Sequence, residues 1–136
     1  MRSVPISGVA AAIVSAWVLS VSSTSAHHSR AGVYETPDKT ITMPAVVAEW
    51  RWRNPHVFLV WDTKGPDGAS VQWVGELSSI TTMMGEGMTR TTLKPGDQVT
   101  VTVVPARSGA PQGQLVKVVM ADGKVPLDRT RGPIPD

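Results

Sequence analysis

The feature that most constrains the fold of this 136-residue chain is a series of short β-prone runs between turns rich in Gly, Pro and Asp. The clearest run is 98–103, in which Val99, Val101 and Val103 alternate with polar residues. A period of two is typical of a strand with one buried face. The other β-prone runs are 40–52, 56–61, 71–77 and 115–120, with a short return strand expected near 125–127. We therefore predict an all-β domain.

One segment between the third and fourth runs, 78–86, has helical character. Ser78 or Ser79 can cap a short helix, and Gly85 and Gly87 are expected to end it. Its apolar positions are Ile80, Met83 and Met84. The expected order of elements is three strands, a short helix and then two further strands. This is the order found in the five-stranded OB-type barrel. We predict a small OB-like barrel with one short helix between strands 3 and 4; an immunoglobulin-like sandwich or another small barrel stays open.

The first 26 residues have the order of a secretory signal peptide. Arg2 is followed by an apolar run, 9–21, and by small residues that end at Ala26. The run is too short and too rich in serine for a membrane span. We expect a periplasmic or secreted protein, with no membrane attachment after cleavage, whose mature chain begins at His27; an uncleaved anchor is the alternative.

This pattern divides the chain into four parts. We expect a signal peptide at 1–26, an N-terminal arm at 27–38, the OB-like barrel at 39–128 and a flexible tail at 129–136. A domain of this length buries a core without disulfides, and the chain has no cysteine. Its 13 basic and 11 acidic residues form no positive cluster of the kind that nucleic-acid binding requires. Nucleic acid is therefore not an expected partner.

Five short motifs follow one another along the chain. They are Ala-His-His-Ser at 26–29, Glu-Trp-x-x-x-Asn-Pro-His at 49–56, Trp-x-x-Glu-Leu at 73–77, Thr-Leu-Lys-Pro-Gly-Asp at 92–97 and Ala-Asp-Gly-Lys at 121–124. In this order they resemble the small exported bacterial proteins of domain-of-unknown-function family 6152. The resemblance implies a periplasmic β-barrel-like domain and supplies no activity. The chain departs from the family at 87–88, where Gly-Met replaces Gly-Trp, and methionine fills the same apolar space more flexibly.

All three histidines, His27, His28 and His56, lie in these motifs. Cleavage after Ala26 would leave His27 with a free amine beside its imidazole, a chelating pair to which His56 could add a third nitrogen. A second geometry uses the amine, the intervening amide and His28. Such nitrogen sets favour Cu(II), although imidazole also suits Zn and Ni. The hypothesis is a metal site with copper as its cofactor, similar in ligand type to the histidine brace of copper oxygenases and copper carriers.

The competing interpretation is a polar N-terminus beside a cleavage site, with His56 in the turn after Asn54-Pro55. Three methionines, Met83, Met84 and Met88, are interpreted as core residues rather than as Cu(I) ligands. At the end of the run 40–52 and just after it, a second candidate site has Trp50 and Trp52 on one face and Arg51 and Arg53 on the other.

An aromatic strip on an OB barrel can stack sugars, and the same rings can equally fill a core. Together with Glu76, these tryptophans and arginines form the alternative site, for a glycan or a protein partner in the periplasm. Glu76 also fits a rim residue that hydrogen-bonds a turn or pairs with an arginine. Trp61 and Trp73 are expected in the core.

No complete catalytic motif is present. The chain has no cysteine nucleophile, no nucleophile elbow, no phosphate-binding glycine loop and no carboxylate pair of defined spacing. The sequence therefore favours a binding protein over an enzyme, with a copper oxygenase as the third hypothesis.

Overall fold

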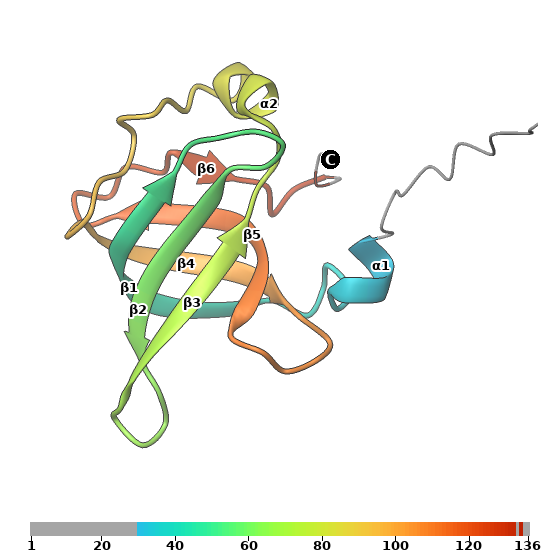
Figure 1. Cartoon of the computed structure of the whole chain (residues 1–136), viewed down its shortest axis with the longest axis vertical. Helices are drawn as coiled ribbons and strands as arrows, with labels where there is room; N and C mark the ends of the chain where they lie inside the picture. The colour runs from blue at the N-terminus through green and yellow to red at the C-terminus, as the bar shows by residue number, and fades with distance from the viewer. Residues whose placement is uncertain (1–29, 133, 135–136) are drawn as a thin grey trace, which may run out of the picture.

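A computed structural model describes residues 30–132 and residue 134 (Figure 1). The strands are β1 Ile41–Arg51, β2 Phe58–Lys64, β3 Ser70–Glu76, β4 Gln98–Pro105, β5 Gln112–Met120 and β6 Leu127–Asp128, and the helices are α1 Arg30–Val33 and α2 Ile80–Gly85. The strand order is β3-β2-β1-β4-β5-β6, and a parallel β3–β5 pairing closes the first five strands into a barrel. The predicted OB-like barrel with a helix between its third and fourth strands is confirmed.

Strand β1 is long enough to pair with two neighbours. Residues 41–46 pair with β4, and residues 46–51 pair with β2. The carbonyl of Pro44 accepts a hydrogen bond from Thr63 Oγ1 at 2.7 Å, on the edge that β4 does not use. The missing N–H of Pro44 therefore costs no bond of the β1–β4 ladder, as expected for proline at a strand edge.

A bulge in β1 decides which side chains face the barrel interior. The register with β2 shifts between Val47 and Glu49, so one extra residue is inserted there. Ala45 and Val47 are buried before the bulge, and Trp50 packs against the core after it. Side chains at odd positions therefore face inward before the bulge, and those at even positions face inward after it.

Helix α2 covers one end of the barrel (Figure 1). Its N-cap is Ser79, whose hydroxyl accepts a hydrogen bond from the backbone N–H of Thr82, and Gly87 follows it with a φ of 84°. Met83 is fully buried, whereas Met84 is 62% exposed. The predicted cap is confirmed, and the placement of Met84 in the apolar stripe is wrong, because a six-residue helix has only one face against the barrel.

The chain after β6 returns to α2. Arg129, the first residue of the expected tail, is buried, and its guanidinium binds the carboxylate of Glu86. Nη2 of the same guanidinium lies 3.2 Å from Sδ of Met83. This contact joins the C-terminal segment to the helix that covers the barrel.

Strand β6 is held by Asp128, which gives the fold a pH-dependent element. Hydrogen bonds from Thr130 and an ion pair with Lys117 lower the pKa of Asp128 from 3.8 to about 2. A lowered folded-state pKa stabilises the fold above the unfolded-state value, and this contribution disappears as the pH falls through about 2.

We expect Asp128→Asn to flatten the acid side of the stability profile, as measured by urea unfolding from neutral pH down to about 2. The matched control is Asp67→Asn in the β2–β3 hairpin, remote in sequence from Lys117 and Thr130. A profile for Asp128→Asn that is parallel to that of the parent protein would contradict the expectation.

Candidate functional site

One carboxylate, that of Glu76, joins three separate parts of the chain. Its Oε1 forms an ion pair with Nδ1 of His56, from the loop between β1 and β2. Its Oε2 accepts a hydrogen bond from the hydroxyl of Tyr34, just after α1. Glu76 itself is the last residue of β3. The β1–β2 loop, β3 and the segment that follows α1 therefore meet at this side chain.

Two backbone hydrogen bonds fix Val57, at the end of the β1–β2 loop, against the residues that follow β3. The N–H of Val57 donates to the carbonyl of Ser78 at 3.0 Å, and the N–H of Leu77 donates to the carbonyl of Val57 at 2.9 Å. His56 and Glu76 are the residues immediately before Val57 and Leu77. These two bonds hold His56, in the loop, beside Glu76 at the end of β3, as the close contact of their side chains requires.

Tyr34 is anchored on the barrel wall independently of Glu76. Its ring is buried in a small apolar cluster, and its backbone bridges to that of Ala106. Nε of Arg107 donates to the carbonyl of Tyr34 at 2.8 Å, and the N–H of Glu35 donates to Pro105 at 2.9 Å. The segment that leads back to α1 is thus fixed to the end of β4.

The contact with Glu76 decides which ring nitrogen of His56 carries the proton. A carboxylate only accepts hydrogen bonds, so the proton in this contact lies on Nδ1 of His56 when the imidazole is neutral. The lone pair is then on Nε2, and the His56 side chain is 38% exposed. A carboxylate behind the distal nitrogen is the usual environment of a metal-ligating histidine. The site can therefore offer one oriented imidazole ligand.

The other predicted metal ligands, His27 and His28, lie outside the described residues. Between residues 30 and 132, no three His, Asp or Glu side chains are grouped as a metal site would require. His56 is the one histidine in that range. A multidentate nitrogen site at His56 therefore needs ligands from the residues before α1.

The structure places the tryptophans of the alternative site against the core. Trp52 is buried, and Trp50 packs on the same core cluster, with 5.5 Å between the two ring centroids. Nε1 of Trp50 donates to the carbonyl of Thr89 at 3.0 Å. The rings on which a sugar would stack therefore face inward, toward the loop after α2.

Of the two arginines of the alternative site, Arg51 lies on the opposite face of β1 and Arg53 lies beyond the end of the strand. Arg51 binds the Glu49 carboxylate through Nε at 2.9 Å and Nη2 at 2.6 Å. These hydrogen bonds raise the pKa of Arg51 and lower the pKa of Glu49. Arg53 is exposed. Glu76 pairs with His56, in the turn after Asn54-Pro55, as expected for a rim residue that binds a turn. No arginine whose side chain the structure describes forms an ion pair with it.

Sequence reasoning misses one member of this site. Tyr34 lies in none of the five motifs, and its only signal is that it is the single tyrosine of the chain. The hydrogen bond to Glu76 spans 42 residues. A contact of that range is set by the closure of the barrel and leaves no local pattern in the sequence.

Comparison with known proteins identifies a family and no activity. No curated protein and no solved structure matches the chain. A model described as a family of unknown function, DUF6152, matches residues 14–115, well over half of the chain. The matched range contains the first four motifs and the residues of the Glu76 site, whereas the motif at 121–124 lies beyond it. The chain therefore belongs to the DUF6152 family.

Proposed function

We propose that this protein is an exported binding protein that holds a copper ion at the start of its mature chain. The proposed ligands are the amine and imidazole of His27 and Nε2 of His56, with His28 as the ligand of the second geometry. The observation that supports this function is the double contact of Glu76. One oxygen of Glu76 orients His56 for metal ligation, and the other holds Tyr34, just after α1, beside the same carboxylate.

Chain length makes the proposed ligand set attainable. Helix α1 begins at Arg30 and is followed directly by Tyr34. An α-helix rises about 1.5 Å per residue, so the four residues of α1 span only about 6 Å. The three residues from His27 to Arg30 can span up to about 10 Å. Because Tyr34 and His56 contact opposite oxygens of one carboxylate, His27 can approach His56 without any change in the barrel.

The donor set determines the metal preference. An amine and two imidazoles form a nitrogen-only set, which favours Cu(II) over the harder cations. These ligands bind in their deprotonated forms, so affinity should rise with pH. The proposal requires export, because only cleavage after Ala26 gives His27 a free amine. Within residues 30–132, no helix is long and apolar enough to span a membrane.

The first test is calorimetric titration of the protein that begins at His27 with Cu(II). We expect one bound ion, with an affinity that falls at least about tenfold in His56→Ala and by about tenfold in Glu76→Gln. Glu76→Gln tests positioning, because it removes the charge behind Nδ1 while leaving all proposed ligands in place. Lys94→Ala, in the turn before β4, is the matched control and should bind as the parent does.

A second arm tests the terminal amine. A protein with one extra residue before His27 loses the chelate and should bind Cu(II) much more weakly. The N-terminus of the exported protein, read by mass spectrometry, should be His27. The proposal fails if the exported chain begins elsewhere, or if the protein that begins at His27 does not bind the metal.

The alternative, an interaction module for a glycan or a protein partner, gains no support from the contacts. Trp50 and Trp52 face the core, and Arg51 is engaged by Glu49. Quenching of tryptophan fluorescence by a panel of glycans would favour it over the metal site.

A further inference from the structure

The hydroxyl of Tyr34 fixes the second oxygen of the Glu76 carboxylate. A carboxylate only accepts hydrogen bonds, so Tyr34 donates to Oε2 while Nδ1 of His56 contacts Oε1. The last torsion of a glutamate side chain is broad, so a contact at one oxygen alone leaves the carboxylate free to turn. Contacts at both oxygens hold its plane.

The chemistry of this donor suits a carboxylate that must keep its charge. Tyr34 is 7% exposed, and the side chain of Glu76 is 23% exposed. A hydrogen bond to an ionised acceptor is stronger than one between neutral groups, and stronger again away from water. A neutral hydroxyl, unlike an arginine, adds this bond without a positive charge. The negative charge that faces His56 is therefore kept.

One continuous set of backbone pairings joins Tyr34 to Glu76. Tyr34 pairs with Ala106, and the N–H of Ala106 donates to the carbonyl of Gln112 at 3.0 Å. Two residues farther along β5, Gln114 pairs with Glu76. This part of the sheet closes the barrel. The separation of the Tyr34 and Glu76 backbones is therefore set by the fold and does not depend on the contact of their side chains.

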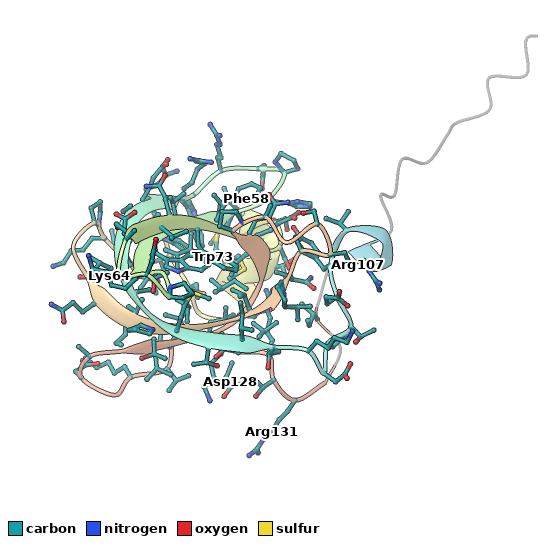
Figure 2. The ribbon with its side chains drawn as sticks, turned by 90° about the horizontal axis from the view of Figure 1, so that it is seen from below. Phe58, Lys64, Trp73, Arg107, Asp128 and Arg131 are labelled. Atoms are coloured by element: carbon teal, nitrogen blue, oxygen red, sulfur yellow. The ribbon has the colours of Figure 1, made fainter. Side chains whose placement is uncertain are left out.

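The same segment fixes the point at which α1 joins the barrel. The N–H of Arg107 donates to the carbonyl of Val33, the last residue of α1, at 3.0 Å. Figure 2 shows Arg107 next to α1, at the edge of the barrel. Helix α1, which leads back to His27 in the sequence, therefore ends at a fixed point on the barrel, one residue before Tyr34.

We propose that Tyr34 is a positioning residue of the proposed copper site. Its hydroxyl holds the Glu76 carboxylate so that the proton of His56 stays on Nδ1 and the lone pair of Nε2 faces the metal. This inference rests on the proposed function and names a residue on which that function depends. The competing explanation is that the hydroxyl only needs a partner because it is buried. Its removal would then change stability and leave His56 as it is.

The first test reads the tautomer of His56 in the metal-free protein that begins at His27. Nitrogen NMR of the imidazole is recorded in alkaline buffer, where the ring is neutral. We expect the proton on Nδ1 in the parent, and a shift of the population toward the Nε2–H tautomer in Tyr34→Phe, because the carboxylate is then free to turn. Tyr34→Phe keeps the ring in its apolar cluster, and circular dichroism checks the fold.

The matched control is Thr42→Val in β1. It removes another partly buried hydroxyl, which lies 2.9 Å from that of Thr102, and leaves the Glu76 contacts in place. We expect the His56 tautomer and the Cu(II) affinity of this variant to be those of the parent.

The second test is calorimetric titration with Cu(II). Tyr34→Phe should weaken binding about fivefold, which is the usual worth of one hydrogen bond. This loss is smaller than that expected for Glu76→Gln, because the hydroxyl acts through the carboxylate. In a Glu76→Ala background, Tyr34→Phe should therefore weaken binding no further, since the two residues act as one unit.

The two tests fail separately. Absence of Cu(II) binding by the parent refutes the proposed function. An unchanged His56 tautomer in Tyr34→Phe refutes the role of Tyr34, whether or not the parent binds the metal. That role is also refuted if Tyr34→Phe and Glu76→Ala weaken Cu(II) binding additively, or if Thr42→Val has the same effects as Tyr34→Phe.

Discussion

Replacement of Trp61 by alanine is expected to lower the free energy of unfolding by about 3–5 kcal/mol, the range for a large aromatic side chain removed from a core. The side chain is 0% exposed and stacks on Trp73. Most small domains are stable by only about 5–15 kcal/mol, so this one change would remove a large share of the total. Urea unfolding followed by circular dichroism measures it.

The control for this prediction is Val46→Ala, on the outer face of β1, where Val46 is largely exposed. A surface change of this kind should stay within about 0.5 kcal/mol. A loss below about 1 kcal/mol for Trp61→Ala would contradict the packing of this ring.

The neighbouring glycine allows a sharper test of the same contact. A Cβ at Gly75 would lie 2.8 Å from Cζ3 of Trp61, so Gly75→Ala alone forces the indole or the strand to move. In the Trp61→Ala background that clash is gone. We therefore expect the cost of Gly75→Ala to be smaller in the double variant, because residues in contact are not additive.

Replacement of Glu86 by alanine is expected to lower the free energy of unfolding by about 2–3 kcal/mol. Removal of one partner of a buried ion pair commonly costs about 3–5 kcal/mol, because the remaining charge is uncompensated. The Arg129 side chain is 5% exposed, whereas that of Glu86 is 28% exposed, so solvent screening reduces the loss. Nε and Nη2 of Arg129 both contact the carboxylate, at 2.8–3.1 Å.

A double variant distinguishes the loss of the attraction between Glu86 and Arg129 from the cost of leaving the buried charge of Arg129 uncompensated. In Glu86→Ala/Arg129→Met the buried guanidinium is absent, so the double variant should be more stable than Glu86→Ala alone. The matched control is Glu35→Ala, which removes the exposed pair with Lys39 and should cost less than about 1 kcal/mol. A double variant that is less stable than Glu86→Ala would contradict this explanation.

Local patterns predicted most of the barrel. The alternation of 98–103 identified β4 because its valines meet a core on one face only, and Val99, Val101 and Val103 are all buried. Ser79 was identifiable as a cap because capping depends on hydrogen bonds within one turn. The bulge between Val47 and Glu49 was beyond such reasoning, because the number of residues between two pairing partners is set when the barrel closes.

The candidate site was predicted in part. His56 was identified from its motif, but Glu76 was grouped with Trp50 and Trp52 instead of with His56. The two residues are 20 positions apart in the sequence and meet because β2 and β3 pair in register, Phe58 opposite Glu76. Tyr34, 42 residues before Glu76 in the sequence, hydrogen-bonds the other oxygen of the same carboxylate. Side chains that converge across strands share no periodicity that a sequence pattern can reveal.

The sequence by itself determined the order of strands and helix, the family and the candidate histidines, because each depends on residues that are close together along the chain. The tertiary structure alone decided that Trp52 packs in the core, that Glu76 orients His56 and binds Tyr34, and that β3 pairs with β5 only over residues 74–76 and 112–114. These features depend on strand register and on where β3 and β5 separate. Barrel closure fixes both through contacts between residues far apart in the chain.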